Sequence, residues 1–255
     1  TNKHLNNIAS WGMDFLGSSS FLWKQKHNSL HHTYTNVHGK DDDIDVAGMI
    51  RLCPEQEHKP WHRFQAFYAP FLYGFLSLYL LFYSDFQRFI KRKIGDTSLT
   101  HIKAKDIAFF SGFKVFYFLY TLVIPMFFYN PLYVVLYFLF GHFVLGLTLS
   151  IVFQLAHTVN ETNFPKPDGE GNMPYSWVEH QLNTTCDFAQ NNPFITFYCG
   201  GLNYQIEHHI FHKISHVHYP AISKIIKQTC EEFGKPYHVN KSFFKALSSH
   251  FKFLY

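Results

Sequence analysis

The sequence predicts an all-α integral membrane protein with a transmembrane helical hairpin, in-plane helices and a helical cap on the cytoplasmic side. Two observations lead to this fold class. Three apolar segments are long enough to cross a membrane, and two clusters of histidine at helical spacing lie on either side of them. Aromatic residues make up 20% of the 255 residues and charged residues only 16%, below the quarter that is usual in soluble chains.

The region before the apolar segments carries the first histidine cluster. Residues 1–26 predict two helical pieces with a break at residues 17–20, and the second piece leads into His27. Residues 33–63 are polar and contain Asp at 41–43 and 45. Such a run after Gly39 is typical of a solvated turn. Because carboxylates also ligate metal ions, the run stays open as an alternative source of ligands.

The three apolar segments cover roughly 64–86, 107–129 and 131–153. A spanning helix needs about 20 mostly apolar residues, so each qualifies by length. If both histidine clusters serve one site, an even number of crossings must separate them. Basic residues flank segment 64–86 on both sides, and such residues favour the cytoplasmic side. We therefore interpret 64–86 as an in-plane or re-entrant piece.

The remaining two segments predict a transmembrane hairpin over residues 107–153. They are joined by Tyr129, Asn130 and Pro131, an uncharged turn with an aromatic residue at the interface. Lys103, Lys105 and Lys114 precede or begin the first span and indicate its cytoplasmic entry.

The C-terminal part predicts the cap over the site. Residues 158–203 are rich in Pro and Gly and form loops, and Gly200 with Gly201 allows a bend before the second histidine cluster. Residues 219–255 predict amphipathic helices rich in Lys and Phe, which suit a membrane surface or a cap. We expect one domain over 1–255.

Both histidine clusters have the spacing of metal ligands. On an α-helix His27 and His31 share a face with His32 beside them. In the second cluster, residues 205–209 (Gln-Ile-Glu-His-His), His208 and His209 lie near the face of Gln205. Imidazole suits iron, copper, zinc and nickel. The four Cys show no Cys-x-x-Cys spacing, which argues against a zinc ribbon or an iron–sulfur cluster.

Three further histidines have distinct expectations. His157 lies at the cytoplasmic end of the second span, where the clusters should meet, and this position supports ligation. His180 either orients ligands through hydrogen bonds or lies on a helix surface. His142 is in the middle of a span, and we expect it to be a packed, hydrogen-bonded neutral imidazole.

The two clusters resemble the second and third histidine boxes of membrane fatty acyl desaturases. The Gln at 205 is similar to that of the front-end subgroup, which includes the linoleoyl-CoA desaturase-like enzymes. The resemblance extends through residues 41–45, 154–157 and 216–220 and covers nearly the whole chain. His212 departs from it, since the family usually has Pro there.

The resemblance implies a di-iron desaturase fold with two non-haem irons and O2 as cofactors. It implies the metal ligands His27, His31, His32, His157, His208 and His209, with Gln205 and His180 hydrogen-bonded to ligands. The implied reaction inserts a cis double bond into an acyl chain that is often already unsaturated. Electrons would come from NAD(P)H through a reductase and a carrier, cytochrome b5 or ferredoxin.

The implied partners are a fatty acyl-CoA or acyl-lipid substrate, the electron carrier and the lipid bilayer. The protein would be multi-pass, with its active site on the cytoplasmic side. Nucleic acid is excluded as a partner, because the basic residues are scattered rather than gathered in a stripe with stacking aromatics.

The family also has an earlier box, His-Asp-x-x-His, which is absent here. We expect the chain to be part of a longer protein, truncated before or within that box. Two alternatives stay open: an acyl or alkyl hydroxylase on the same fold, and a catalytically incomplete membrane protein with a structural or binding role.

Overall fold

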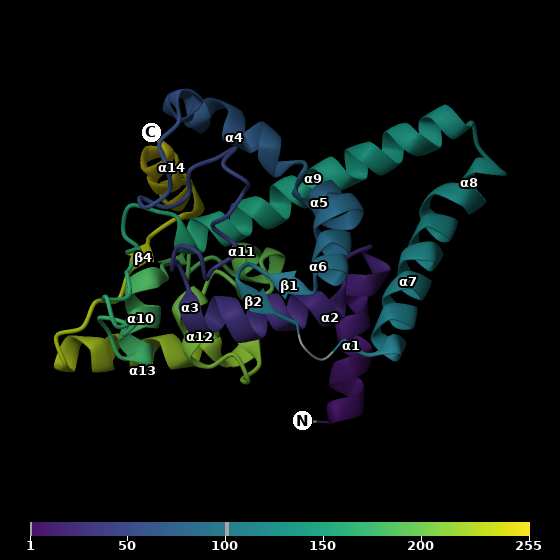
Figure 1. Ribbon diagram of the computed structural model, residues 1–255. Coiled ribbons are helices and arrows are strands. Elements are labelled where there is room, and N and C mark those ends of the chain that lie inside the picture. The colour runs from purple at the N-terminus through teal and green to yellow at the C-terminus, as the bar shows by residue number, and fades with distance from the viewer. Residues whose placement is uncertain (1, 100–101) are drawn as a thin grey trace. The chain divides into compact units, whose positions relative to one another are not determined.

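The computed structural model describes residues 2–99 and 102–255, and most of them are helical (Figure 1). The chain divides into two compact units, residues 1–29 with 70–149 and residues 30–69 with 150–255. The all-α prediction is confirmed, because each strand among the described residues is only two residues long.

The first unit contains the N-terminal helices and the apolar helices. Its elements, including those that extend into the second unit, are α1 (Lys3–Phe15), α2 (Ser20–Trp23), the π-helix η1 (Lys24–His31), α4 (Gln65–Tyr73), α5 (Leu76–Tyr79), the π-helix η3 (Leu80–Ser84), α6 (Asp85–Lys91), β1 (Lys93–Ile94), β2 (Thr97–Ser98), α7 (Ala104–Phe118), the π-helix η4 (Leu119–Val123), α8 (Ile124–Met126) and α9 (Pro131–His157).

The first histidine cluster follows the predicted helical break. The predicted interruption at 17–20 is confirmed, since α1 ends at Phe15 and α2 begins at Ser20. The following helix differs from the prediction, because residues 24–31 are π-helical rather than α-helical. Its i→i+5 bonds widen each turn, while residues four apart, such as His27 and His31, still lie close together around the helix axis.

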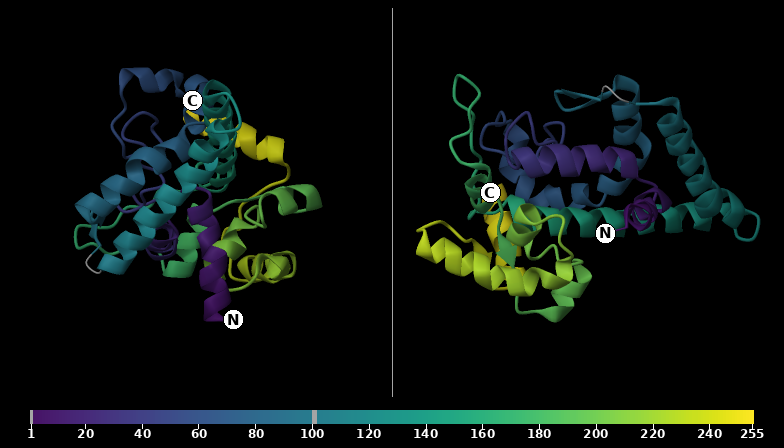
Figure 2. Two further views of the ribbon diagram at one scale, coloured as in Figure 1. Left: turned by 90° about the vertical axis from the view of Figure 1, so that its right-hand side faces the viewer. Right: turned by 90° about the horizontal axis from the view of Figure 1, so that it is seen from below.

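Two helices are long and apolar enough to cross a membrane, Ala104–Met126 and Pro131–His157. The turn at residues 127–130 joins them at one end (Figures 1 and 2). They correspond to the two segments from which the sequence predicts a hairpin over 107–153, and the boundaries of the crossing stay a prediction. Segment 64–86 forms a helix pair bent by 69°, a shape shared by broken spans and re-entrant pieces.

Two buried polar side chains of the first unit, Lys114 and His142, have partners within that unit. Lys114 does not mark an interface as expected, because it is buried and forms an ion pair with Asp85 at 2.9 Å. Its ammonium also donates to the Gly17 carbonyl at 2.6 Å. His142 is packed and hydrogen-bonded as predicted, with the Ser77 hydroxyl 2.9 Å from Nδ1 and the Tyr117 hydroxyl 2.7 Å from Nε2.

The second unit is a helical body with short strands. Its remaining elements are α3 (His32–Tyr34), the 3₁₀-helix η2 (Pro60–Phe64), α10 (Trp177–Thr184), β3 (Asp187–Phe188), α11 (Pro193–Tyr198), α12 (Gln205–Ile210), the 3₁₀-helix η5 (His216–His218), α13 (Tyr219–Glu232), β4 (Val239–Asn240) and α14 (Phe243–Leu254).

Two apolar clusters form the core of this unit. One gathers Leu155 of α9, Phe188 and Ala246 with their neighbours, and the other packs Ile206 of α12 against Leu182 and residues of α13. The strands β3 and β4 pair in parallel, and Phe188 of β3 belongs to the first of these clusters. The predicted bend at Gly200 and Gly201 is confirmed by φ angles of +59° and +81°, a conformation that glycine adopts without strain.

A glycine contact between α9 and the α4–α5 bend gives a test of the fold. A Cβ at Gly146 would lie 2.6 Å from the Gly74 carbonyl oxygen, whereas one at Gly141 meets nothing within 4 Å. We expect Gly146→Ala to lower the free energy of unfolding by about 1–3 kcal/mol through overpacking. Gly141→Ala on the same helix should be neutral or stabilising by up to about 1 kcal/mol.

Thermal unfolding of both variants in the same detergent would measure the difference. A Gly146→Ala protein that melts at or above the wild-type temperature would contradict the close approach of these helices.

Candidate metal centre

Three buried imidazoles converge inside the second unit. His31 ends η1, His157 ends α9 and His209 lies on α12, so segments far apart in the sequence each supply one ring. Their ring centroids are 4.7 Å (His31–His157), 5.0 Å (His31–His209) and 4.9 Å (His157–His209) apart. One nitrogen from each ring lies within 4.8 Å of the other two. This spacing allows all three to bind one metal ion.

Each ring has a fixed acceptor for its Nδ1 hydrogen. His31 Nδ1 lies 3.0 Å from a carboxylate oxygen of Asp41, and His157 Nδ1 lies 3.2 Å from the Thr184 carbonyl. His209 Nδ1 lies 2.8 Å from Oε1 of Gln181. Because these oxygens only accept hydrogen bonds, each Nδ1 carries the hydrogen and each Nε2 keeps a lone pair.

Metal-ligating histidines almost always donate their other ring hydrogen in this way. His209 is the clearest example of a ring whose Nε2 could bind a metal ion, because this atom is buried and has no hydrogen-bond partner among the described residues. A buried lone pair without a partner is unfavourable, and a metal ion at this position would satisfy it. The donor set therefore fits a histidine-bound metal.

Gln205 lies beside the same cluster. Its amide nitrogen is 2.9 Å from Nε2 of His157 and donates to that lone pair. A metal ion on His157 would take the same lone pair, so binding requires the Gln205 amide to move or turn. This contact places the predicted supporting residue next to a predicted ligand.

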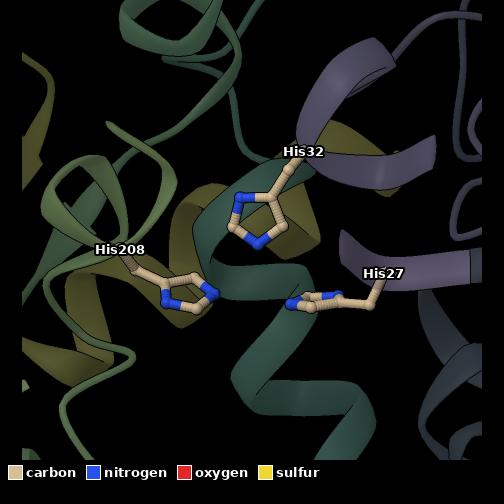
Figure 3. Close-up of side chains that lie close together, drawn as sticks. All are labelled: His27, His32 and His208. Carbon is tan, nitrogen blue, oxygen red and sulfur yellow. The ribbon is translucent and has the colours of Figure 1, made fainter. Parts of the chain in front are cut away.

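A second pair of predicted ligands lies next to the first group. His32, at the start of α3, and His208, on α12, have ring centroids 4.8 Å apart, and Figure 3 shows their rings facing a common space. His32 also stacks on His209 at 4.3 Å. His27 belongs to the other unit, and its role as a ligand stays a prediction from the sequence.

Burial keeps these rings neutral. Together with the neighbouring imidazoles, it lowers the pKa of His32 to about 2 and the pKa of His208 to about 4. Burial, followed by the surrounding imidazoles, also holds the pKa of His209 well below its usual value. Because a metal binds the neutral form of imidazole, this environment favours binding at neutral pH.

Asp41 has a role that the sequence did not reveal. It is 2% exposed, so the aspartate run is not simply a solvated turn. Besides His31, its carboxylate accepts hydrogen bonds from the backbone N–H groups of Asn36 at 2.8 Å and Asp43 at 3.0 Å. Asp41 thus contacts a predicted ligand, and a run of four acidic residues gives no signal for which one is buried.

Residues of α10 support the site from the other side. Gln181 joins the two histidine clusters, because it accepts from His209 Nδ1 and donates to the His32 carbonyl at 3.1 Å. His180 does not contact a ligand ring. Its Nε2 donates to the Thr35 carbonyl at 2.8 Å, next to the first cluster. The sequence singled out His180 and missed Gln181, since a lone Gln carries no metal signal.

Comparison with known proteins identifies relatives over the whole chain. A family model described as fatty acid desaturase matches residues 1–241. The sn-1 linoleoyl-lipid 6-desaturase of Synechocystis sp. is 38% identical over 256 residues, which cover 100% of this chain and 71% of that protein. The protein of the same name from Arthrospira platensis is 38% identical over 251 residues, 98% of this chain and 68% of that protein.

A plant relative matches over a smaller share of its own length. The acyl-lipid (8-3)-desaturase of Physcomitrium patens is 36% identical over 256 residues, which cover 97% of this chain and 52% of that protein. No solved structure matches the chain significantly.

The neutral, buried rings predict a loss of stability in acid. The unfolded chain protonates its histidines below about pH 6.5, whereas His32 and His208 stay neutral in the folded protein at that pH. The unfolded state then binds more protons, so stability falls as the pH falls. We expect the free energy of unfolding of chelator-treated protein to fall by about 1 kcal/mol per buried ring and pH unit as the pH drops below about 6.5. The melting temperature should therefore decrease between pH 7.5 and 5.5.

The exposed His58 provides the control. His58→Ala should show the same decrease as the wild type. A melting temperature that is constant or higher at pH 5.5 would contradict the neutral state of the buried rings.

Removal of the Asp41 carboxylate tests the orientation of His31. Asp41→Ala should weaken metal affinity by about 10–100-fold, because the ring loses the acceptor that directs its Nε2. Asp168→Asn, an exposed aspartate on a loop, should leave the affinity unchanged. Titration with Co²⁺ in competition with a chelator measures both variants, and equal affinities would exclude this role of Asp41.

Proposed function

The chain belongs to the fatty acid desaturase family, and from this premise we propose that it inserts a cis double bond into an acyl chain by means of a histidine-ligated di-iron centre. The observation that carries the proposal is the group His31, His157 and His209, three buried rings with satisfied Nδ1 atoms and converging Nε2 atoms. We assign these three to one iron. We assign His32 and His208, with His27 by resemblance, to the other.

The reaction explains why such a centre is needed. Removal of two hydrogens from adjacent unactivated methylenes is beyond any side-chain acid or base. When bound, the irons supply this chemistry together with O2 and two electrons. We propose that the electrons come from NAD(P)H through a reductase and a separate carrier, cytochrome b5 or ferredoxin.

The chain's own residues hold and orient the centre. Asp41, Gln181 and the Thr184 carbonyl direct one ligand ring each, and burial keeps the rings neutral and excludes water. A metal site that lies 0–6% exposed at its three histidines limits the access of water to reactive species. Gln205, hydrogen-bonded to His157, adjusts when that ring takes its metal.

The relatives suggest the form of the substrate. Three of them are named as desaturases of acyl lipids, two of linoleoyl lipids. We therefore favour an acyl-lipid substrate, already unsaturated, over an acyl-CoA. The new double bond would lie between the existing one and the carboxyl end, as in the front-end subgroup.

The protein is a membrane protein with two candidate spanning helices. We propose that it is multi-pass and that its active site faces the cytoplasm. Support comes from the exposed basic residues at the ends of the apolar segments, including Lys91, Lys103 and Lys105, since such residues favour the cytoplasmic side.

Product analysis tests the function. The complete protein is expressed in a host that is supplied with linoleate, and the double bonds of its lipids are mapped by mass spectrometry. We expect a new double bond on the carboxyl side of the existing ones. An alcohol instead of an alkene would identify a hydroxylase, and an unchanged lipid profile would contradict the proposal.

Ligand variants test the site in the same host. His31→Ala and His209→Ala should abolish the product, at least 100-fold, because the metal loses a buried ligand, while the amount of protein in the membrane stays the same. His58→Ala serves as the control and should retain wild-type product levels. Product formation by His209→Ala at more than a few percent of wild type would exclude that ring as a ligand.

A further inference from the structure

Two carboxyl groups are buried next to the first turns of α12. Asp187 begins β3 and Glu207 lies on α12, and both are 0% exposed. Burial, followed by the neighbouring Asp187, raises the pKa of the Glu207 carboxyl group. The hydroxyl of Tyr237 lies 2.9 Å from Oδ2 of Asp187 and 2.9 Å from Oε1 of Glu207. None of these residues has a part in the chemistry described above.

Burial of such a cluster is energetically unfavourable. A buried carboxyl group destabilises a protein by several kcal/mol unless its oxygens are hydrogen-bonded. Here the hydrogen-bond partners among the described residues include a hydroxyl, an amide and a backbone N–H: Tyr237, the Gln190 side chain at 2.7 Å and Ile206 N at 2.8 Å. An apolar core would fill this space with a smaller desolvation penalty, so burial alone does not explain the polar cluster.

The cluster holds α12 at two independent points. Asp187 accepts the N–H of Ile206 in the first turn, a donor that has no partner within its own helix. Glu207 is held by the Tyr237 hydroxyl at 2.9 Å. Residues two apart on an α-helix point about 160–200° apart, so a fixed Glu207 directs His209 away from the cluster and toward His31 and His157.

Helix α12 needs such anchors because it is short. It has six residues, far below the length at which an isolated helix is stable. Glycines precede it, and residues 211–218 after it are exposed. The apolar contacts of Ile206 with Leu182 and Ile226 are non-directional, so they bury the helix without determining its rotation.

We propose that Asp187, Glu207 and Tyr237 are positioning residues that set the rotation of α12 and thereby aim the His208 and His209 rings at the metal. The proposal rests on the proposed function, since it presumes a metal at these rings. It assigns to this buried cluster a role in metal affinity and geometry that is separate from its contribution to stability.

The test uses the purified complete protein with Co²⁺ as the probe, because the visible bands of bound Co²⁺ report ligand geometry. Tyr237→Phe removes only the bridging hydroxyl and keeps the ring volume. Its matched control is Tyr68→Phe, which removes a half-buried hydroxyl that donates to the Met49 carbonyl at 2.8 Å in the same unit. The melting temperature of each chelator-treated variant is recorded alongside.

We expect Tyr237→Phe to weaken Co²⁺ binding by about 10–100-fold, as loss of ligand-orienting contacts does in metal sites, and to change the Co²⁺ bands. Asp187→Ala should weaken Co²⁺ binding by at least as much. Asp187→Asn should bind Co²⁺ more tightly than Asp187→Ala, because its amide oxygen still accepts the hydrogen bond of the Ile206 N–H. Tyr68→Phe should keep the wild-type Co²⁺ affinity and the wild-type Co²⁺ absorption bands, even if its melting temperature changes.

Wild-type Co²⁺ affinity and bands in Tyr237→Phe would overturn the proposal, including when its melting temperature falls. His209→Ala separates this failure from failure of the metal centre. If His209→Ala loses Co²⁺ while Tyr237→Phe retains it, the positioning role is wrong and the proposed centre stands. If His209→Ala also binds Co²⁺ as the wild type does, both are wrong.

Discussion

The second unit is organised around three buried imidazoles, His31, His157 and His209, each of which has an acceptor for its Nδ1 hydrogen. A neutral ring carries one hydrogen and one lone pair, and both are unfavourable to bury without partners. The protein supplies the acceptors from its own chain at 2.8–3.2 Å. Among the described residues, Nε2 of His209 has no hydrogen-bond partner.

The fold brings these acceptors from separate segments. Asp41 comes from the polar loop after the first cluster, and Gln181 and Thr184 come from the single helix α10. Two apolar clusters form the core of the same unit, and one of them contains Ile206 of α12. Gln181 links the two halves through one side chain, because its oxygen binds the His209 ring and its nitrogen binds the His32 backbone. A shift of α10 would therefore disturb both halves together.

The sequence was sufficient to predict those features that depend only on residue type and on spacing along the chain. Apolar length predicted the two candidate spanning helices, and clustered histidines predicted two of the three rings that converge. The isolated His157 was found because the end of a span places it near the clusters. The mid-span His142 was correctly interpreted as a packed residue.

The supporting residues could not be predicted, because their roles depend on burial and on contacts between distant segments. Asp41 differs from Asp42 only in its three-dimensional surroundings, and Gln181 and Asp187 lie in sequences without any metal signal. Lys114 was taken as an interfacial charge because a sequence does not show that Asp85 lies beside it. The π-helix at residues 24–31 likewise has no reliable signature in composition or periodicity.

Iron X-ray absorption spectroscopy of the purified complete protein measures the ligands of the metal directly. The account predicts a coordination sphere of nitrogen and oxygen with the outer-sphere scattering of several imidazoles and without sulfur. Sulfur ligands, or a sphere of oxygen alone without imidazole scattering, would contradict a centre built from these histidines.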